Sequence, residues 1–172
     1  MAILCCIPSI AAEAQSIQTL EQHGACDFDG FVEAVNAVQA IRKERLISAK
    51  RFAEMADEAN TMVLDARGES DFAVLHVKGN KNLPFTSFGT KSLNELVPNK
   101  ETRILIYCRN NLTNSAVRGF IPYIEKSAPG GLNIPTAVTL YSYGYRNVWE
   151  LDEIVDPEET PITFVRQSRP QK

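Results

Sequence analysis

The sequence has no apolar run long enough to cross a membrane, since none of its hydrophobic stretches reaches the roughly 18 residues that a membrane-spanning helix needs. It also lacks a strong excess of charge, because 18 basic residues stand against 21 acidic ones and give a net charge of −3. A basic surface for nucleic acid is therefore not expected. With 172 residues, 44% hydrophobic and 23% charged, the chain has the composition of one globular domain.

Cysteine is scarce, and its spacing argues against a metal site. The four cysteines include no C-x-x-C pair, so neither a zinc site nor a thioredoxin-like motif is expected; they are Cys5, Cys6, Cys26 and Cys108. Cys26 and Cys108 lie far apart in the sequence. A disulfide between them is permitted in an oxidising compartment, but the sequence does not indicate one.

The N-terminus has no Lys or Arg before Arg42. Residues 1–14, MAILCCIPSIAAEA, are apolar and end in an A-x-A pattern, which predicts a signal peptide cleaved before Gln15 and hence an exported, periplasmic or secreted protein. The missing basic region leaves a second interpretation open, a loosely packed N-terminus on a cytoplasmic protein. The predicted boundaries are 1–14 for the signal, 15–44 for an extension with a helix, 45–165 for the domain and 166–172 for a flexible tail.

Helical and extended patterns alternate along the rest of the chain. Apolar spacing and caps predict helices at 28–44, 49–60, 92–98 and 131–145, and a helical turn at 68–77. Ser48 is expected to cap the second helix and Asn133 the last, which Gly144 ends. Apolar runs predict strands at 45–48, 61–67, 103–108 and 147–151, and a short extended piece follows the turn residues of 78–85. After 151, a tail rich in proline and charge is expected to wrap the surface.

This alternation predicts an α/β domain with a central, mostly parallel sheet between layers of helices and an extra N-terminal helix. The strands are apolar on both faces, as a sheet covered on both sides requires. Ligands of such sheets bind beyond the carboxyl ends of the strands. Two strands end there in reactive or charged residues, one in Asp65-Ala66-Arg67 and the other in Cys108-Arg109.

Cys108 is the candidate nucleophile. A thiol attacks as thiolate, and inward-pointing amides or a nearby guanidinium favour that form. The residues after it tolerate unusual backbone angles and carry a cation, which suits a cradle for an anion; they are Arg109, Asn110, Asn111, Leu112, Thr113, Asn114 and Ser115. The plain alternative is that Cys108 is a small buried apolar residue followed by an ordinary turn.

Several short motifs follow one another in order within residues 45–152. They are Asp65-Ala66-Arg67, then His76 and Gly79 before Asn82-Leu83-Pro84, then the strand ending at Cys108, and last Gly144-Tyr145-Arg146-Asn147-Val148 before the final strand. This succession resembles the rhodanese-like domain family. The resemblance implies a rhodanese-like three-layer fold in which Asp65 and Arg67 are structural residues near the site and His76 is a scaffold residue.

The resemblance also implies a function. Cys108 would accept a sulfane sulfur from an anionic donor such as thiosulfate, hold it as a persulfide and pass it to a thiol or cyanide, with no metal and no organic cofactor. A second hypothesis is a non-catalytic rhodanese-like module that binds an anion or a protein partner, whose identity the sequence does not give. A thiol-redox protein using Cys26 and Cys108 ranks lower.

Three features depart from the family pattern. Asn114-Ser115 stands where an arginine often ends the loop, at a spacing that resembles the Cys-x5-Arg phosphatases and arsenate reductases; without the bidentate cation, that activity is a low-ranked alternative. Residues 116–131 form an insertion, either a lid or a surface excursion, in which Arg118 could replace the missing arginine. Asp152-Glu153 replaces a Gly-Gly turn.

Overall fold

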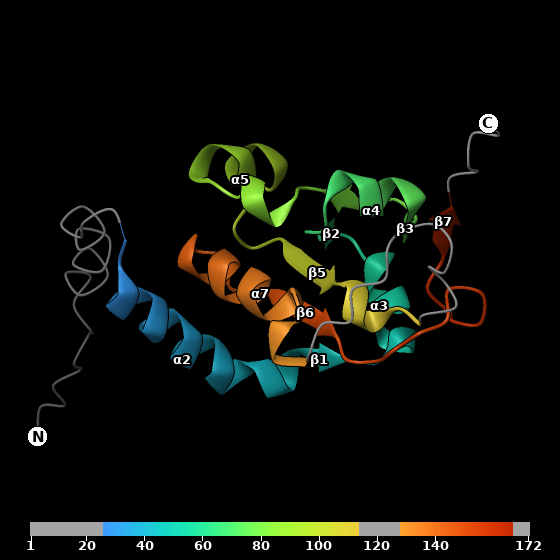
Figure 1. Ribbon diagram of the computed structural model, residues 1–172, viewed down its shortest axis with the longest axis horizontal. Helices are drawn as coiled ribbons and strands as arrows, with labels where there is room; N and C mark the ends of the chain where they lie inside the picture. The colour runs from blue at the N-terminus through green and yellow to red at the C-terminus, as the bar shows by residue number, and fades with distance from the viewer. Residues whose placement is uncertain (1–25, 114–127, 167–172) are drawn as a thin grey trace, which may run out of the picture.

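The computed structural model describes residues 26–113 and 128–166. The main sheet has five parallel strands in the order β1-β6-β5-β2-β4, and a separate antiparallel pair joins β3 to β7 (Figure 1). The strands are β1 Leu46–Ile47, β2 Thr61–Asp65, β3 Leu75–Val77, β4 Lys81–Asn82, β5 Arg103–Tyr107, β6 Val148–Leu151 and β7 Phe164–Arg166. The helices are α2 Phe28–Arg45, α3 Ala49–Ala56, α4 Glu69–Val74, α5 Thr90–Leu96 and α7 Asn133–Ser142.

Local sequence signals set the ends of the helices. The Asp27 carboxylate accepts a hydrogen bond from the Gly30 amide at the start of α2, and the Ser48 hydroxyl accepts one from the Arg51 amide at the start of α3. The last helix, α7, ends at Ser142, shortly before Gly144. Gly144 adopts a positive φ of 90°, a conformation that is sterically unfavourable for other residues.

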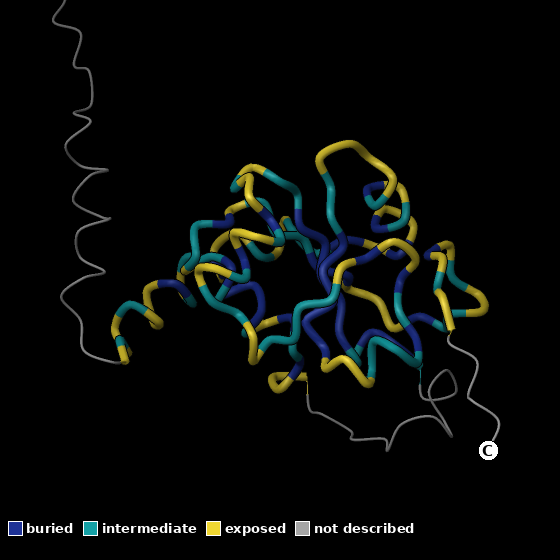
Figure 2. The backbone as a smooth tube through the Cα atoms, turned by 90° about the horizontal axis from the view of Figure 1, so that it is seen from above, coloured by how far each residue is buried: buried dark blue, intermediate teal, exposed yellow. Residues whose placement is uncertain are grey.

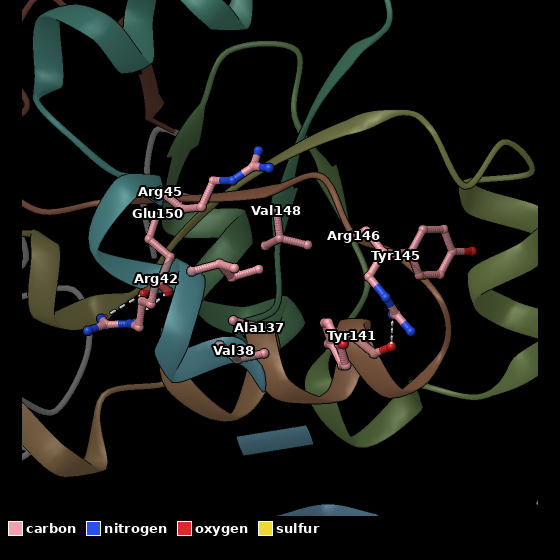
Figure 3. A pocket seen from close by; sticks show the side chains of 10 residues that line it. Val38, Arg42, Arg45, Ala137, Tyr141, Tyr145, Arg146, Val148 and Glu150 are labelled. Atoms are coloured by element: carbon pink, nitrogen blue, oxygen red, sulfur yellow. Dashed lines mark hydrogen bonds and ion pairs between the residues drawn. The ribbon is translucent and has the colours of Figure 1, made fainter. Parts of the chain in front are cut away.

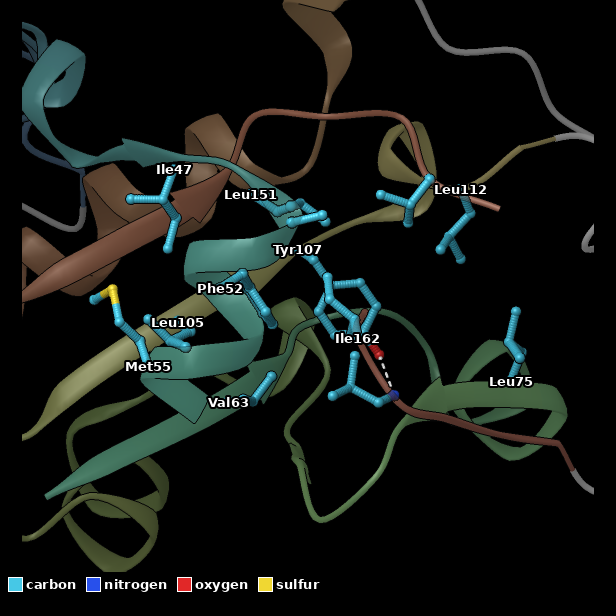
Figure 4. Close-up of a cluster of buried hydrophobic side chains, with 13 residues drawn as sticks. Ile47, Phe52, Met55, Val63, Leu75, Leu105, Tyr107, Leu112, Leu151 and Ile162 are labelled. Atoms are coloured by element: carbon cyan, nitrogen blue, oxygen red, sulfur yellow. Dashed lines mark hydrogen bonds between the residues drawn. The ribbon is translucent and has the colours of Figure 1, made fainter. Parts of the chain in front are cut away.

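The strand β5 forms the centre of the sheet and supplies both faces of the core. Ile104 and Ile106 face a cluster with α2, α5 and α7, whereas Leu105 and Tyr107 face a cluster with α3 and β3 (Figure 4). This division follows from the alternation of side chains along a strand. The buried backbone accordingly runs through the middle of the molecule in Figure 2, and the exposed residues lie toward its periphery. The predicted α/β fold with two helical layers is confirmed.

Three local predictions were wrong. The predicted helical turn at 68–77 ends at Val74, and Leu75–Val77 continue as β3 because β7 pairs with them; β7 in turn lies in the tail that we expected only to wrap the surface. The short extended piece lies at Lys81–Asn82, and Phe85–Ser87 form a 3-10 turn. Asn133 is not the cap of α7 but its first residue, after Leu132.

The N-terminal helix α2 is attached to the sheet by a buried acid. It packs on α7 and β6, and its first turns extend beyond the sheet (Figure 1). Arg42 donates two hydrogen bonds of 2.8 Å to the carboxylate of Glu150 on β6, whose exposed fraction is only 2%. Hydrogen bonding to this carboxylate raises the pKa of Arg42. The sequence pattern gave no sign that Glu150 would be buried.

Some predictions concern residues outside the described ranges. The signal peptide at 1–14 and the end of the tail after Arg166 stay predictions for this reason. Within 26–113 and 128–166, no helix combines the length and hydrophobicity that a membrane span requires.

The Arg42–Glu150 pair yields a stability prediction. Replacing Arg42 by Met keeps the length of the side chain but leaves the Glu150 carboxylate buried without its cation. Because Arg42 is itself 34% exposed, we expect a loss of about 2 kcal/mol, less than for a fully buried pair. Urea unfolding measures this loss. The control, Arg51→Met, removes only exposed ion pairs and should change stability by less than about 0.5 kcal/mol; an equal effect of both substitutions would contradict the role given to Glu150.

Candidate functional site

The strand β5 delivers Cys108 to the carboxyl edge of the sheet. Hydrogen-bonded β2 and β6 flank β5 on its two sides, and Cys108 follows directly after Tyr107 with extended backbone angles. Its side chain is nearly covered, since the residue is 2% exposed. The thiol therefore lies where ligands of parallel sheets bind, and the protein holds it in place from two sides.

The residues after Cys108 form one 3-10 turn and then an extended link. Arg109–Asn111 make the turn, and the Asn111 amide donates to the Cys108 sulfur as well as to the Cys108 carbonyl oxygen, at 3.1 Å. The next amides serve the backbone, because Leu112 donates to the Arg109 carbonyl at 3.1 Å and Thr113 to the Val155 carbonyl at 3.0 Å. Of these three amides, that of Asn111 is the one directed at the sulfur.

The other predicted cradle residues have different positions. The Arg109 side chain is 13% exposed, and its guanidinium lies 4.0 Å from the carboxylate of Asp71 on α4. Asn110 packs against Gly131, where an added Cβ would approach its amide nitrogen to 3.3 Å. Leu112 is buried and bridges to Val155. Asn114, Ser115 and Arg118 lie outside the described residues, so their predicted contacts stay predictions.

The side chain of Asn111 joins three segments around the cysteine. Its oxygen accepts hydrogen bonds from the Cys108 amide at 2.9 Å and from the Asn133 side chain at 3.1 Å. Its nitrogen donates to the carbonyl oxygens of Leu151 at 2.8 Å and Glu153 at 3.1 Å. The end of β5, the start of α7 and the end of β6 are thus held together by one buried amide. The sequence included Asn111 only as a backbone donor.

Asp65 and Arg67 form a buried ion pair behind the site. The Arg67 guanidinium donates to both carboxylate oxygens of Asp65, at 2.9 and 2.6 Å, and to the carbonyl oxygen of Leu75 at 2.6 Å. The Tyr107 hydroxyl donates to Asp65 at 2.6 Å. Burial, the Asp65 charge and the hydrogen bond to it raise the pKa of Tyr107. The pair ties β2 and β3 to the last residue of β5.

Two further motif residues support this scaffold. The Asn82 side chain donates to the carbonyl oxygens of Asp65 at 2.9 Å and Arg67 at 3.0 Å, which fixes the chain just after β2. The His76 ring stacks on Phe72, and its Nδ1 lies 2.8 Å from the Phe72 carbonyl oxygen. Both contacts of His76 are made with the neighbouring Phe72 and are structural, in keeping with the scaffold role expected for this residue.

The two cysteines in the described residues do not form a disulfide with each other. Cys26 is exposed and Cys108 buried, and both are free thiols. Among residues 26–113 and 128–166, no group of three or more His, Cys, Asp or Glu side chains is placed to hold a metal ion. Of these two thiols, Cys108 is therefore the candidate nucleophile that lies in a built environment.

A cavity between α2, α7 and β6 is separate from this site. Its lining includes Arg42, Arg45 and Arg146, and Cys108 is not part of it. The three guanidinium groups point in different directions in Figure 3, and each has its own partner, respectively Glu150, Asn147 and the carbonyl oxygen of Tyr141. They do not converge on a common anion, so we interpret the cavity as a packing gap under the N-terminal helix.

The family model for the rhodanese-like domain matches residues 48–153. The chain belongs to the rhodanese-like domain family. The match begins at the cap of α3 and ends just after β6, so the N-terminal helix α2 and the strand β7 lie outside it. The matched region thus contains Cys108 and four strands of the five-stranded sheet, whereas β1 lies just before it and α2 is an addition on its α7 face.

Solved structures of rhodanese-like proteins are similar to this chain at low identity. A thiosulfate sulfurtransferase from Pseudomonas aeruginosa is 24% identical, with a TM-score of 0.42, over 62% of this chain and 17% of that one. A rhodanese with anions from E. coli is 16% identical, with a TM-score of 0.40, over 62% of this chain and 99% of that one. The Alr3790 protein from Anabaena is 18% identical, with a TM-score of 0.41, over 61% and 68%. No curated protein sequence matches this chain significantly.

The buried ion pair yields a second stability prediction. Asp65→Asn keeps the shape of the side chain but leaves the Arg67 cation buried without its counter-charge. We expect a loss of about 3–5 kcal/mol in the free energy of unfolding, measured in urea. Glu95→Gln is the control, because its partner Lys91 is exposed and lies 3.9 Å away. The scaffold role of Asp65 is refuted if the two variants unfold at the same urea concentration.

Proposed function

We propose that this protein is a sulfurtransferase or sulfane-sulfur carrier that forms a persulfide on Cys108. The main supporting observation is the position of the Cys108 thiol at the carboxyl end of the central strand, where the Asn111 N–H donates a hydrogen bond to its sulfur. An N–H directed at the sulfur stabilises negative charge there, in a thiolate or in the persulfide formed from it. The membership of the chain in the rhodanese-like domain family supports the same function.

The reaction requires two displacements at sulfur and no redox partner. The Cys108 thiolate attacks the outer sulfur of thiosulfate; the S–S bond of the donor breaks, sulfite leaves with the electron pair, and the enzyme holds a persulfide anion. A thiolate or cyanide then attacks the outer sulfur of that persulfide. The new S–S or S–C bond forms as the enzyme S–S bond breaks, and the Cys108 thiolate returns. The substrates are thus a small anionic donor and a nucleophilic acceptor.

The charges near the thiol suit an anionic donor. Arg109 follows Cys108 directly, and its guanidinium lies 4.0 Å from the carboxylate of Asp71. A thiosulfate dianion approaching the sulfur gains Coulomb attraction from this cation, and the attraction is strong because the side chain is largely removed from water. We assign Arg109 the role of attracting the donor.

The second candidate function is a rhodanese-like module that binds without catalysis. The observations in its favour are the near-complete burial of Cys108 and the use of the Leu112 and Thr113 amides by backbone carbonyls. A thiol this well covered, in a loop this closed, can be an inert part of the core. A redox role for Cys26 and Cys108 has less support, since Cys26 is exposed and precedes a helix that extends away from the sheet (Figure 1).

Mass spectrometry of the intact protein separates these functions. After incubation with thiosulfate, the native protein should gain the mass of one sulfur atom, and added cyanide should remove it with release of thiocyanate. The Cys108→Ser variant should gain nothing. The Cys26→Ser variant should behave as the native protein does, because Cys26 lies outside the site.

Two outcomes would contradict the proposal. A native protein that stays at its original mass and yields no thiocyanate refutes the sulfurtransferase function and leaves the binding module. A sulfur adduct that persists in Cys108→Ser and disappears in Cys26→Ser would place the sulfur on Cys26 and refute the role given to Cys108.

A further inference from the structure

The Asn111 side chain is fully occupied within the protein. A carboxamide has one oxygen that accepts two hydrogen bonds and one nitrogen that donates two. Here the oxygen accepts from Cys108 and Asn133, and the nitrogen donates to Leu151 and Glu153, at distances from 2.8 to 3.1 Å. No capacity remains for a substrate. Asn111 is 7% exposed, so this arrangement is removed from water.

Each of these four bonds bears on the position of the thiol, and the bond from Asn133 connects Asn111 to the start of α7. The bond to the Cys108 amide fixes the peptide plane from which the cysteine side chain projects. The bonds to Leu151 and Glu153 anchor Asn111 to the segment after β6. That segment is itself anchored, because Glu153 accepts from the Ala49 amide at the start of α3 at 3.2 Å, and the Asp152 amide donates to the carbonyl oxygen of Ile47.

Through the same residue, the backbone contributes directly to the sulfur. The Asn111 amide donates to the sulfur of Cys108, so the side chain that is held by β6 and α7 also places this N–H. A rotation of Asn111 would therefore move both the thiol and its donor. Reacting groups must be held within a fraction of an ångström, since a misplacement of about 1 Å can lower a rate by about a hundredfold.

We infer that Asn111 is a positioning residue for Cys108. It couples the orientation of the thiol to the end of β6 and the start of α7. This inference rests on the proposed function for its catalytic consequence, but not for its geometric content. Asn111 does not touch the sulfur donor through its side chain. It holds the nucleophile and the amide that meets it in one arrangement, and it makes the segment after β6 part of the support of the site.

The test compares Asn111→Ala with Asn147→Ala. Asn147 is a matched control because its side chain also bonds several partners, namely Arg45, Trp149 and the carbonyl oxygen of Glu101, but at the opposite end of β6. Both variants lose a hydrogen-bonded asparagine, so both lose stability, which urea unfolding measures. Only Asn111→Ala releases Cys108.

Two measurements follow the thiol. Alkylation by iodoacetamide, with the exposed Cys26 in the same molecule as the reference, should speed up at Cys108 by about tenfold or more in Asn111→Ala and stay within about twofold in Asn147→Ala. Sulfur loading from thiosulfate should show the opposite sign: the maximal loading rate falls about tenfold in Asn111→Ala, while the thiosulfate concentration for half-maximal loading stays within about twofold, because the side chain does not bind the donor.

Each outcome decides a separate question. If alkylation and loading of Asn111→Ala rise together, or if both variants behave alike, Asn111 is merely structural and the inference is overturned. If thiosulfate affinity falls while the maximal rate is kept, Asn111 is a binding residue and the inference is again wrong. If the native protein takes up no sulfur, the proposed function fails, and alkylation still decides whether Asn111 holds the thiol.

Discussion

The buried ion pair between Asp65 and Arg67 is the interaction on which the rest of the structure depends. Arg67 neutralises the Asp65 carboxylate at the end of β2 and donates a hydrogen bond to the Leu75 carbonyl oxygen at the start of β3. Asp65 also accepts a hydrogen bond from the Tyr107 hydroxyl at the end of β5. Two ions taken out of water are costly unless they pair closely and hydrogen-bond to their neighbours. The pair therefore constrains where β2, β3 and β5 can end relative to one another.

The position of Cys108 follows from that constraint. Tyr107 is fixed by Asp65 on one face of β5, and Cys108 comes next in the chain. From the other side, Asn111 fixes the Cys108 amide and connects it to the ends of β6 and α7. The Cys108 thiol is thus held by a charged network on one side and a neutral amide network on the other. Such support from outside the reacting groups is what keeps a site in its productive geometry.

The sequence predicted the features that depend on local pattern or on motif order. The apolar strands predicted at 61–67 and 103–108, which the structure shows at 61–65 and 103–107, the cap at Ser48 and the glycine at 144 each follow from short-range rules, and the motif order indicated the family correctly. Pairing of β3 with β7 could not be predicted, because nearly ninety residues separate the two strands and neither has a distinctive pattern. The burial of Glu150 depends on Arg42, which lies 108 residues away.

The functional site shows the same division. Cys108 and the Asp65–Arg67 pair lie within motifs, so the sequence indicated them as candidates, and the structure places them at the ends of the neighbouring strands β5 and β2. The structural roles of Asn111 and Asn133 depend on long-range hydrogen bonds: Asn111 bonds to Leu151, 40 residues away, and Asn133 to Asn111, 22 residues away. In the sequence alone, polar residues after a strand are typical of any turn. Residues that bond their own backbone locally are indistinguishable in sequence from residues that join distant segments. The sequence therefore predicts a cap at Asn133, whereas in the structure the Asn133 side chain donates to Asn111.

The most direct test of the account is a crystal structure of the native protein after treatment with thiosulfate. The account predicts one additional sulfur atom bonded to the Cys108 sulfur at about 2.05 Å, with Asn111 still bonded to Cys108, Asn133, Leu151 and Glu153. An unmodified Cys108 in crystals whose protein has turned over thiosulfate, or a sulfur atom found on Cys26 instead, would contradict it.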